Sequence, residues 1–234
     1  MSSRTTSSRV LFYLFSSFSL IGCIAYVLCT LLPAVAMNPL IHVICLAFLF
    51  FFIYISGRFY SADMPKEDKA RVMHRTFVCL LVLYSFTVIS LTLFDGSMGR
   101  TGFESIEKWK NINSTELEKH LNLVPFKTLS RFFMGIFNKN YSSYSIIINL
   151  LGNAVIFMPF ACLLPAVFSR LSRFWVFLLT MVCAVSVIEL LQLVLLTGCC
   201  DIDDLILNVF GALSAYAFFG IPIIKKGVKR LSLF

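Results

Sequence analysis

The chain is arranged in six long apolar blocks that are separated by polar segments. A helix needs roughly 20 apolar residues to cross a bilayer, and most of the blocks are near that length. Inside lipid, backbone polar groups must be paired within the segment, which favours helices. The pattern therefore predicts an all-α polytopic membrane protein with about six transmembrane helices. We expect these helices at about residues 10–32, 40–55, 76–94, 145–168, 174–196 and 202–224.

Composition agrees with this prediction. Hydrophobic residues make up 59% of the 234 residues, charged residues only 14%, and the mean hydropathy is +0.87. A soluble domain carries about 25% charged residues. The net charge of +8 does not indicate a nucleic-acid partner, because no soluble fold is predicted that would present a basic face. The expected partner is the lipid bilayer, and the oligomeric state stays open.

The Lys and Arg residues predict the orientation of the helices. Positive residues are enriched on the cytoplasmic side of membrane proteins. With both termini cytoplasmic, the segments 1–9, 57–75, 169–173 and 225–234 hold 13 of the 20 Lys and Arg residues and three acids. The opposite side then has seven bases and nine acids. We therefore predict cytoplasmic termini and an extracytoplasmic loop over residues 95–144.

That loop, at roughly 50 residues, is long enough to be functional. Residues 104–120 are predicted to form a short surface helix. Residues 122–129, NLVPFKTL, predict an X-Pro turn with apolar neighbours that lies against the membrane surface.

Polar side chains are predicted to meet in the outer half of the last three membrane helices. Asn149 and Asn153 lie four residues apart near the outer end of one helix. Glu189 is 15 residues from Phe174, or about 22 Å into a core of roughly 30 Å. On a helix, Asp201, Asp204 and Asn208 share one face, and Asp203 points elsewhere. The predicted binding residues, called the polar cluster below, are Asn149, Asn153, Glu189, Gln192, Asp201, Asp204 and Asn208.

Each of these residues also has a purely structural interpretation. Asn and Gln often bridge helices, and an Asp at a helix start is an N-cap. Glu189 is harder to explain in this way, since an ionised carboxylate within a membrane costs about 2.5–3.5 kcal/mol. It is either protonated or paired, and Lys127 or Arg131 of the outer loop are candidate partners. The cluster favours a cation, a proton, or a cationic or hydroxyl-bearing ligand.

Cysteine and histidine predict no metal site and no cofactor. Six of the eight cysteines lie inside apolar blocks, and Cys199 and Cys200 are adjacent. Zinc-binding pairs are usually two to four residues apart. His42, His74 and His120 are scattered, so no Ser/His or Cys/His catalytic arrangement is indicated.

Four ordered motifs resemble those of VanZ-like membrane proteins. They are NLVPFKTL (122–129), NLLGNAVIFMPFACLLP (149–165), IELLQ (188–192) and DIDDLILNVFGALSAY (201–216). The chain departs from this family at Phe160-Ala161, where a Gly is common. It departs again at Cys199-Cys200, where an Arg often precedes the aspartates. The resemblance implies a VanZ-like four-helix core over residues 76–234, preceded at 1–75 by two extra helices and a basic cytoplasmic loop.

The resemblance also implies a multi-pass protein of the bacterial cytoplasmic membrane. The family's namesake is linked to teicoplanin resistance, so we expect altered susceptibility to glycopeptide antibiotics, with an envelope lipid or a glycopeptide as ligand. Two alternatives stay open. One is a membrane-embedded enzyme acting on a lipid-linked or phosphorylated envelope substrate, and the other is a small proton-coupled carrier. Whether the protein is an enzyme is not decided by the sequence.

Overall fold

The protein is an all-α polytopic membrane protein. Its computed structural model describes residues 3–31, 39–94, 118, 120–137, 143–222 and 224. Within that part, six helices are long and apolar enough to cross a membrane. The chain divides into two compact units, one of residues 1–87 with 222–234 and one of residues 88–221. The predicted domain boundary at residue 75 stays a prediction.

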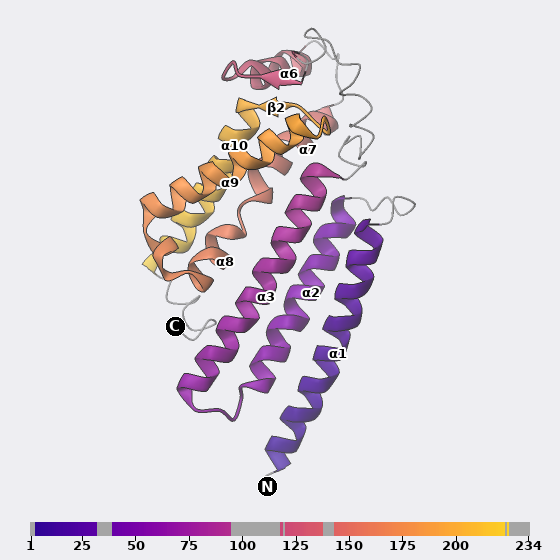
Figure 1. Cartoon of the computed structure of the whole chain (residues 1–234), viewed down its shortest axis with the longest axis vertical. Coiled ribbons are helices and arrows are strands. Elements are labelled where there is room, and N and C mark those ends of the chain that lie inside the picture. The colour runs from indigo at the N-terminus through magenta and orange to yellow at the C-terminus, as the bar shows by residue number, and fades with distance from the viewer. Residues whose placement is uncertain are drawn as a thin grey trace. The chain divides into compact units, whose positions relative to one another are not determined.

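Unit 1 contains three long helices: α1 (Ser3–Leu31), α2 (Pro39–Tyr60) and most of α3 (Lys66–Leu93). Helices α1 and α2 pack side by side around the buried residues Tyr26, Leu49 and Leu83 (Figure 1). The Tyr26 hydroxyl and His42 Nδ1 are 3.0 Å apart, and both side chains are buried. Phe50 of α2 meets Tyr84 of α3 edge to face.

Unit 2 is built around its last helix, α10 (Ile202–Gly220). This helix packs against α7 (Ser143–Ile156), α8 (Phe160–Val167) and α9 (Phe174–Val194). The α10 positions that face these neighbours carry small residues, and Gly211 lies against the backbone of Ala154 in α7. Close packing through small residues is typical of membrane helix pairs, where no hydrophobic effect drives the helices together.

The other end of α10 is fixed by an aromatic contact. The Phe177 ring, fully buried in α9, stacks on Tyr216 with ring centroids 4.5 Å apart. The Tyr216 hydroxyl donates a 2.6 Å hydrogen bond to the carbonyl of Ser172, in the short 3₁₀ helix η3 (Ser169–Ser172).

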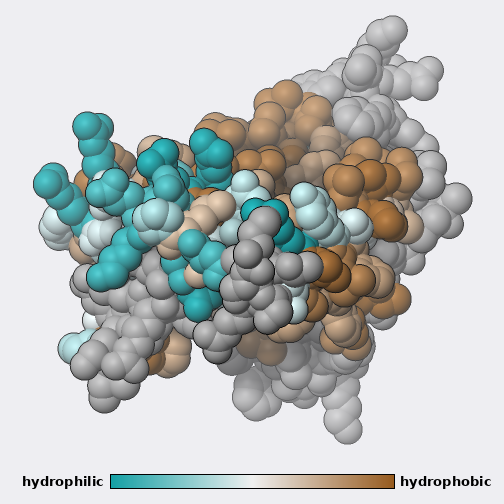
Figure 2. Space-filling model, turned by 90° about the horizontal axis from the view of Figure 1, so that it is seen from below, coloured by the Kyte–Doolittle hydropathy of each residue, from teal (hydrophilic) through white to brown (hydrophobic). Residues whose placement is uncertain are grey.

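The structure corrects two helix boundaries. Helix α3 begins at Lys66 rather than at Thr76, because the polar segment before the apolar block is itself helical. Glu67 and Asp68 lie in its first turn, where they complement the helix dipole, and Arg71 pairs with Asp68 at 2.7 Å. Figure 2 shows the corresponding end of the molecule, where hydrophilic residues gather beside apolar surface.

The second correction concerns the fourth predicted membrane helix. Instead of one helix over 145–168, the chain forms α7, a turn at Phe157–Pro159, and α8. Pro159 lacks an N–H and its ring crowds the preceding turn, which accounts for the break at this point. The two pieces still provide a candidate membrane span over Leu150–Val167.

Candidate functional site

The segment before α6 (Lys127–Phe137) is joined to the start of α10 by backbone pairing. Strand β1 (Leu121–Asn122) pairs in parallel with β2 (Cys200–Asp201). His120 extends this bridge, since its carbonyl accepts from the Cys200 N–H at 2.8 Å and its Nδ1 lies 2.9 Å from the Gly198 carbonyl oxygen. Figure 1 shows α6 and β2 at the same end of unit 2. A segment of the loop between α3 and α7 is therefore held at the N-terminal end of α10.

Asp203 holds the turn that follows β1. Its Oδ1 accepts a hydrogen bond from the Phe126 N–H at 2.5 Å, and its Oδ2 accepts from Thr128 at 2.8 Å and Leu129 at 3.1 Å. The Asp203 side chain is fully buried, and these donors compensate its charge. Phe126 is held at a φ of +64°, which is unusual for a residue other than glycine. We call residues 123–129 the anchored turn.

Asp201 links the anchored turn to the start of α10. It is the N-cap residue, since its side chain accepts from the Asp203 N–H at 2.9 Å. Its Oδ1 also accepts from Asn122 Nδ2 at 2.9 Å, and its Oδ2 accepts from the Thr128 hydroxyl at 2.5 Å. The N-cap interpretation of Asp201 is therefore confirmed, and the same carboxylate also binds β1 and the turn.

Glu189 is buried, with 5% of its surface exposed, and reaches the same network from α9. Its Oε2 accepts a 3.0 Å hydrogen bond from the Asp201 N–H. Lys127 and Arg131, the sequence candidates for an ionic partner, are exposed on α6. Glu189 therefore connects α9 to the backbone at the head of α10.

The rest of the polar cluster joins other helices. Asn153 of α7 donates to Asp204 Oδ1 at 2.5 Å, which is a direct polar contact between α7 and α10. Gln192 donates to the Thr92 carbonyl at the end of α3, at 3.0 Å. Asn208 is buried one turn beyond Asp204. The Asn149 side chain lies outside the described side chains.

Several buried polar atoms in this region have no hydrogen-bond partner among the described residues. They are Asn122 Oδ1, Gln192 Oε1, Thr197 Oγ1 and Asn208 Oδ1. Each belongs to a side chain that is more than nine-tenths buried. Three of the four are amide oxygens, which can only accept hydrogen bonds. The region therefore has unused capacity for a hydrogen-bond donor such as water, an ammonium group or a hydroxyl.

The adjacent cysteines Cys199 and Cys200, the second of which lies in β2, are kept protonated by this environment. Burial, together with the neighbouring carboxylates of Asp201 and Asp204, raises the pKa of Cys199 to about 11. Burial also raises the pKa of Cys200, with Glu189 and Asp201 adding to the effect. Among the described residues, no group of three or more His, Cys, Asp or Glu side chains is arranged to hold a metal ion.

Sequence reasoning missed three residues of this network: Asp203, Asn122 and Thr128. Asp203 was set aside because it lies on a different side of the helix from Asp204, and that side faces the anchored turn. Asn122 and Thr128 lie within the NLVPFKTL motif, which indicated a turn but not its partner. The expected surface helix at 104–120 lies almost entirely outside the described residues.

Comparison with known proteins adds one match. A family model described as VanZ/LLP1 matches residues 77–224, which include the whole polar cluster and the anchored turn. No curated protein and no solved structure matches the chain.

Proposed function

Because the chain belongs to the VanZ/LLP1 family, we propose that it alters the susceptibility of a bacterial cell to teicoplanin-type glycopeptide antibiotics through the polar cluster. In this proposal the protein lies in the cytoplasmic membrane with both termini in the cytoplasm. The polar cluster then faces the outer side, where a glycopeptide acts. The distribution of Lys and Arg supports this orientation.

One observation carries the proposal: polar side chains of three helices, with Glu189 buried and Asn153 and Asp204 half-buried, form hydrogen bonds within or at the end of candidate membrane spans. Asn153 of α7 contacts Asp204 of α10, and Glu189 of α9 binds the Asp201 backbone. Ionisable groups inside a membrane are costly, and they usually mark a functional pathway or site. Simple anchoring of a loop would require Asp201 and Asp203, but it would not require Asp204.

The polar atoms of the cluster indicate which chemical groups a ligand needs in order to bind there. The buried amide oxygens of Gln192 and Asn208 accept hydrogen bonds only. Together with the carboxylates they favour a ligand that carries amine, amide or hydroxyl donors. A glycosylated peptide offers all three groups, and so does the sugar of a lipid-linked envelope precursor.

The proposal is tested by measuring teicoplanin susceptibility in a Gram-positive host that expresses the wild-type protein, Glu189→Gln or Asp204→Asn at equal membrane levels. We expect the wild type to raise the inhibitory concentration and both variants to lose most of that effect. Asp63→Asn is the matched control, because Asp63 is exposed in the turn between α2 and α3. Equal protection by all four proteins would make the cluster a packing feature and overturn the proposal.

The burial of Glu189 also supports a second candidate function, a small proton-coupled carrier. Such a carrier would show proton-dependent uptake in vesicles, and Glu189→Gln would abolish it. An unchanged inhibitory concentration with the wild type, combined with proton-dependent uptake, would favour the carrier over the first proposal.

A further inference from the structure

The anchored turn exposes apolar side chains outside the candidate membrane spans. Leu123, Val124 and Phe126 are 62%, 57% and 61% exposed, and Pro125 between them is exposed as well. Four adjacent apolar residues at the tip of one turn form a patch rather than scattered surface residues. Contiguous apolar patches of this kind mark sites of contact with a membrane or with another protein.

The turn is held rigidly in this exposed position. Asp203 accepts backbone hydrogen bonds from Phe126, Thr128 and Leu129, and Asp201 accepts from the Thr128 hydroxyl. These residues have therefore already lost conformational entropy on folding, before the tip binds a partner. A fixed apolar tip binds at lower entropic cost than a flexible loop.

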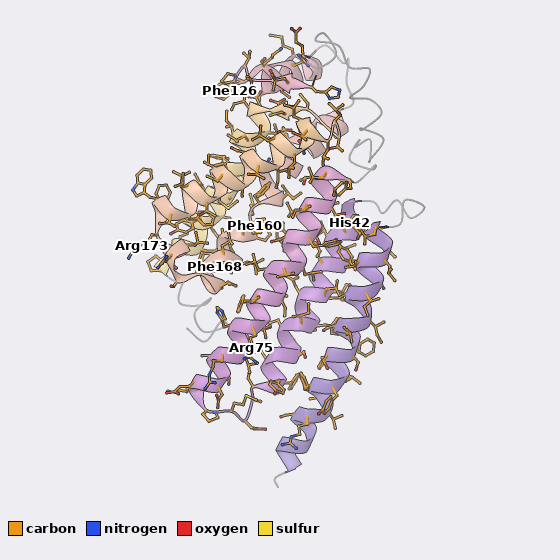
Figure 3. The ribbon with its side chains drawn as sticks, viewed as in Figure 1. His42, Arg75, Phe126, Phe160, Phe168 and Arg173 are labelled. Carbon is orange, nitrogen blue, oxygen red and sulfur yellow. The ribbon has the colours of Figure 1, made fainter. Side chains whose placement is uncertain are left out.

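The position of the turn determines which partner it meets. Asp201 caps α10, whose candidate membrane span begins at Ile202. The residues that hold the turn are thus at the point where the chain enters the apolar layer. Helix α6 crosses this same end of unit 2, and Figure 3 places Phe126 beside it. A tip fixed at the head of a membrane helix lies at the level of the lipid headgroups.

The charges next to the tip fit lipid as well. Lys127, Ser130 and Arg131 lie on the first turn and a half of α6, and all three are exposed. Basic side chains beside an apolar surface are typical of segments that lie in the membrane interface. Lys and Arg side chains are attracted to the phosphates of an anionic lipid surface.

We propose that residues 123–131 form an interfacial membrane anchor. Leu123, Val124 and Phe126 enter the boundary between headgroups and acyl chains, and Lys127 and Arg131 bind lipid phosphates. The anchor places Asp203 and Asp201 at the membrane surface and fixes the depth of the head of α10. This role does not depend on the antibiotic-related function.

The test uses tryptophan fluorescence of the full chain in vesicles of phosphatidylcholine and phosphatidylglycerol. The native Trp109 and Trp175 are replaced by Phe, and a single probe is introduced as Phe126→Trp. We expect blue-shifted emission that brominated acyl chains quench strongly and aqueous iodide quenches weakly. The matched probe Glu118→Trp, at an exposed position of the same loop outside residues 123–131, is expected to show the reverse order of quenching.

Two outcomes would overturn the anchor. If iodide quenches Phe126→Trp as strongly as Glu118→Trp, the tip is in water. If neither quencher reaches it, protein covers the tip instead of lipid. A further variant tests the three backbone hydrogen bonds from the anchored turn to Asp203, called the clamp below. Asp203→Asn in the Phe126→Trp background should reduce quenching by brominated lipid, whereas Asp63→Asn should leave it unchanged. Circular dichroism confirms that each variant is folded, so that a loss of quenching is not a loss of structure.

Discussion

The Asp201 N–H donates a 3.0 Å hydrogen bond to Glu189 Oε2, which ties the buried carboxylate of α9 to the first residue before α10. The Asp201 side chain in turn binds Asn122 and Thr128. A single residue therefore connects the membrane helix, the two-residue strand pair and the anchored turn. Substitutions of Glu189 that keep or remove its acceptor oxygen should therefore have different effects.

Glu189→Leu is expected to destabilise the protein more than Glu189→Gln. Leucine leaves the buried Asp201 N–H without an acceptor, which costs about 1–3 kcal/mol. Glutamine keeps an oxygen in reach of that N–H while it removes the charge. Thermal unfolding in detergent, followed by circular dichroism, measures the difference. Equal melting temperatures for the two variants would mean that this hydrogen bond contributes little to stability.

Asp203→Asn is expected to loosen the anchored turn. The asparagine side chain offers one acceptor oxygen for three backbone N–H groups, and hydrogen bonds to a charged group are worth about 1.5–3 kcal/mol each. Hydrogen exchange should accelerate at Phe126, Thr128 and Leu129 and remain unchanged in α9. The control is Asp63→Asn, which makes the same chemical change at an exposed position. Unchanged protection in Asp203→Asn would contradict the clamp.

Gly211→Ala is expected to weaken the packing between α7 and α10. A Cβ at this position would overlap the carbonyl oxygen of Ala154, and backbone cannot move aside as a side chain can. Overpacking of this kind costs about 1–3 kcal/mol. Gly152→Ala in α7 is the matched control, because no atom lies within 4 Å of its added Cβ. We expect a lower melting temperature for Gly211→Ala, with little change or a slight increase for Gly152→Ala.

Cys199 is expected to react slowly with iodoacetamide at neutral pH. Its pKa of about 11, raised from 9.0, keeps the thiol protonated and lowers the fraction of the reactive thiolate. Near pH 7 the rate should be roughly 10–100-fold below that of an ordinary thiol. The rate should also keep rising above pH 9, where the rate of an ordinary thiol levels off.

This rate is measured by mass spectrometry in a variant that retains Cys199 as its single cysteine. A plateau near pH 9 would show that the thiol is neither desolvated nor close to the carboxylates. A corresponding variant that retains only Cys200 allows a second comparison. There, Glu189→Gln removes a negative charge and should lower the pKa and speed alkylation.

The sequence predicted the membrane helices well because the apolar blocks are long and the requirement for paired backbone groups leaves few alternatives. It was less accurate where local chemistry competes with hydropathy. The start of α3 was placed too late, since a polar stretch of good helix formers continues the helix. The break between α7 and α8 was missed, although Pro159 was visible in the sequence.

The partners of the polar residues could not be read from the sequence. Helical periodicity grouped Asp204 with Asn208. The hydrogen bonds from Thr128 to Asp203 and from Asn122 to Asp201, however, join residues about 75–80 positions apart, and no local sequence pattern indicates such a contact. The predicted depths of these side chains in the membrane did place Asn153 near Asp204 and Glu189 near Asp201, and hydrogen bonds join both pairs. Whether these residues bind a ligand stays a prediction.

The clamp between Asp203 and the anchored turn also has a consequence for the order of assembly. Thr128 and Asp203 are 75 residues apart, and two membrane-spanning segments lie between them. During synthesis the anchored turn is made long before Asp203. Its backbone N–H groups therefore cannot bind the Asp203 carboxylate until α10 has entered the bilayer. Contacts between distant residues close late in folding. The clamp is thus a marker of completed insertion, and a chain truncated before α10 should leave residues 123–129 open to protease.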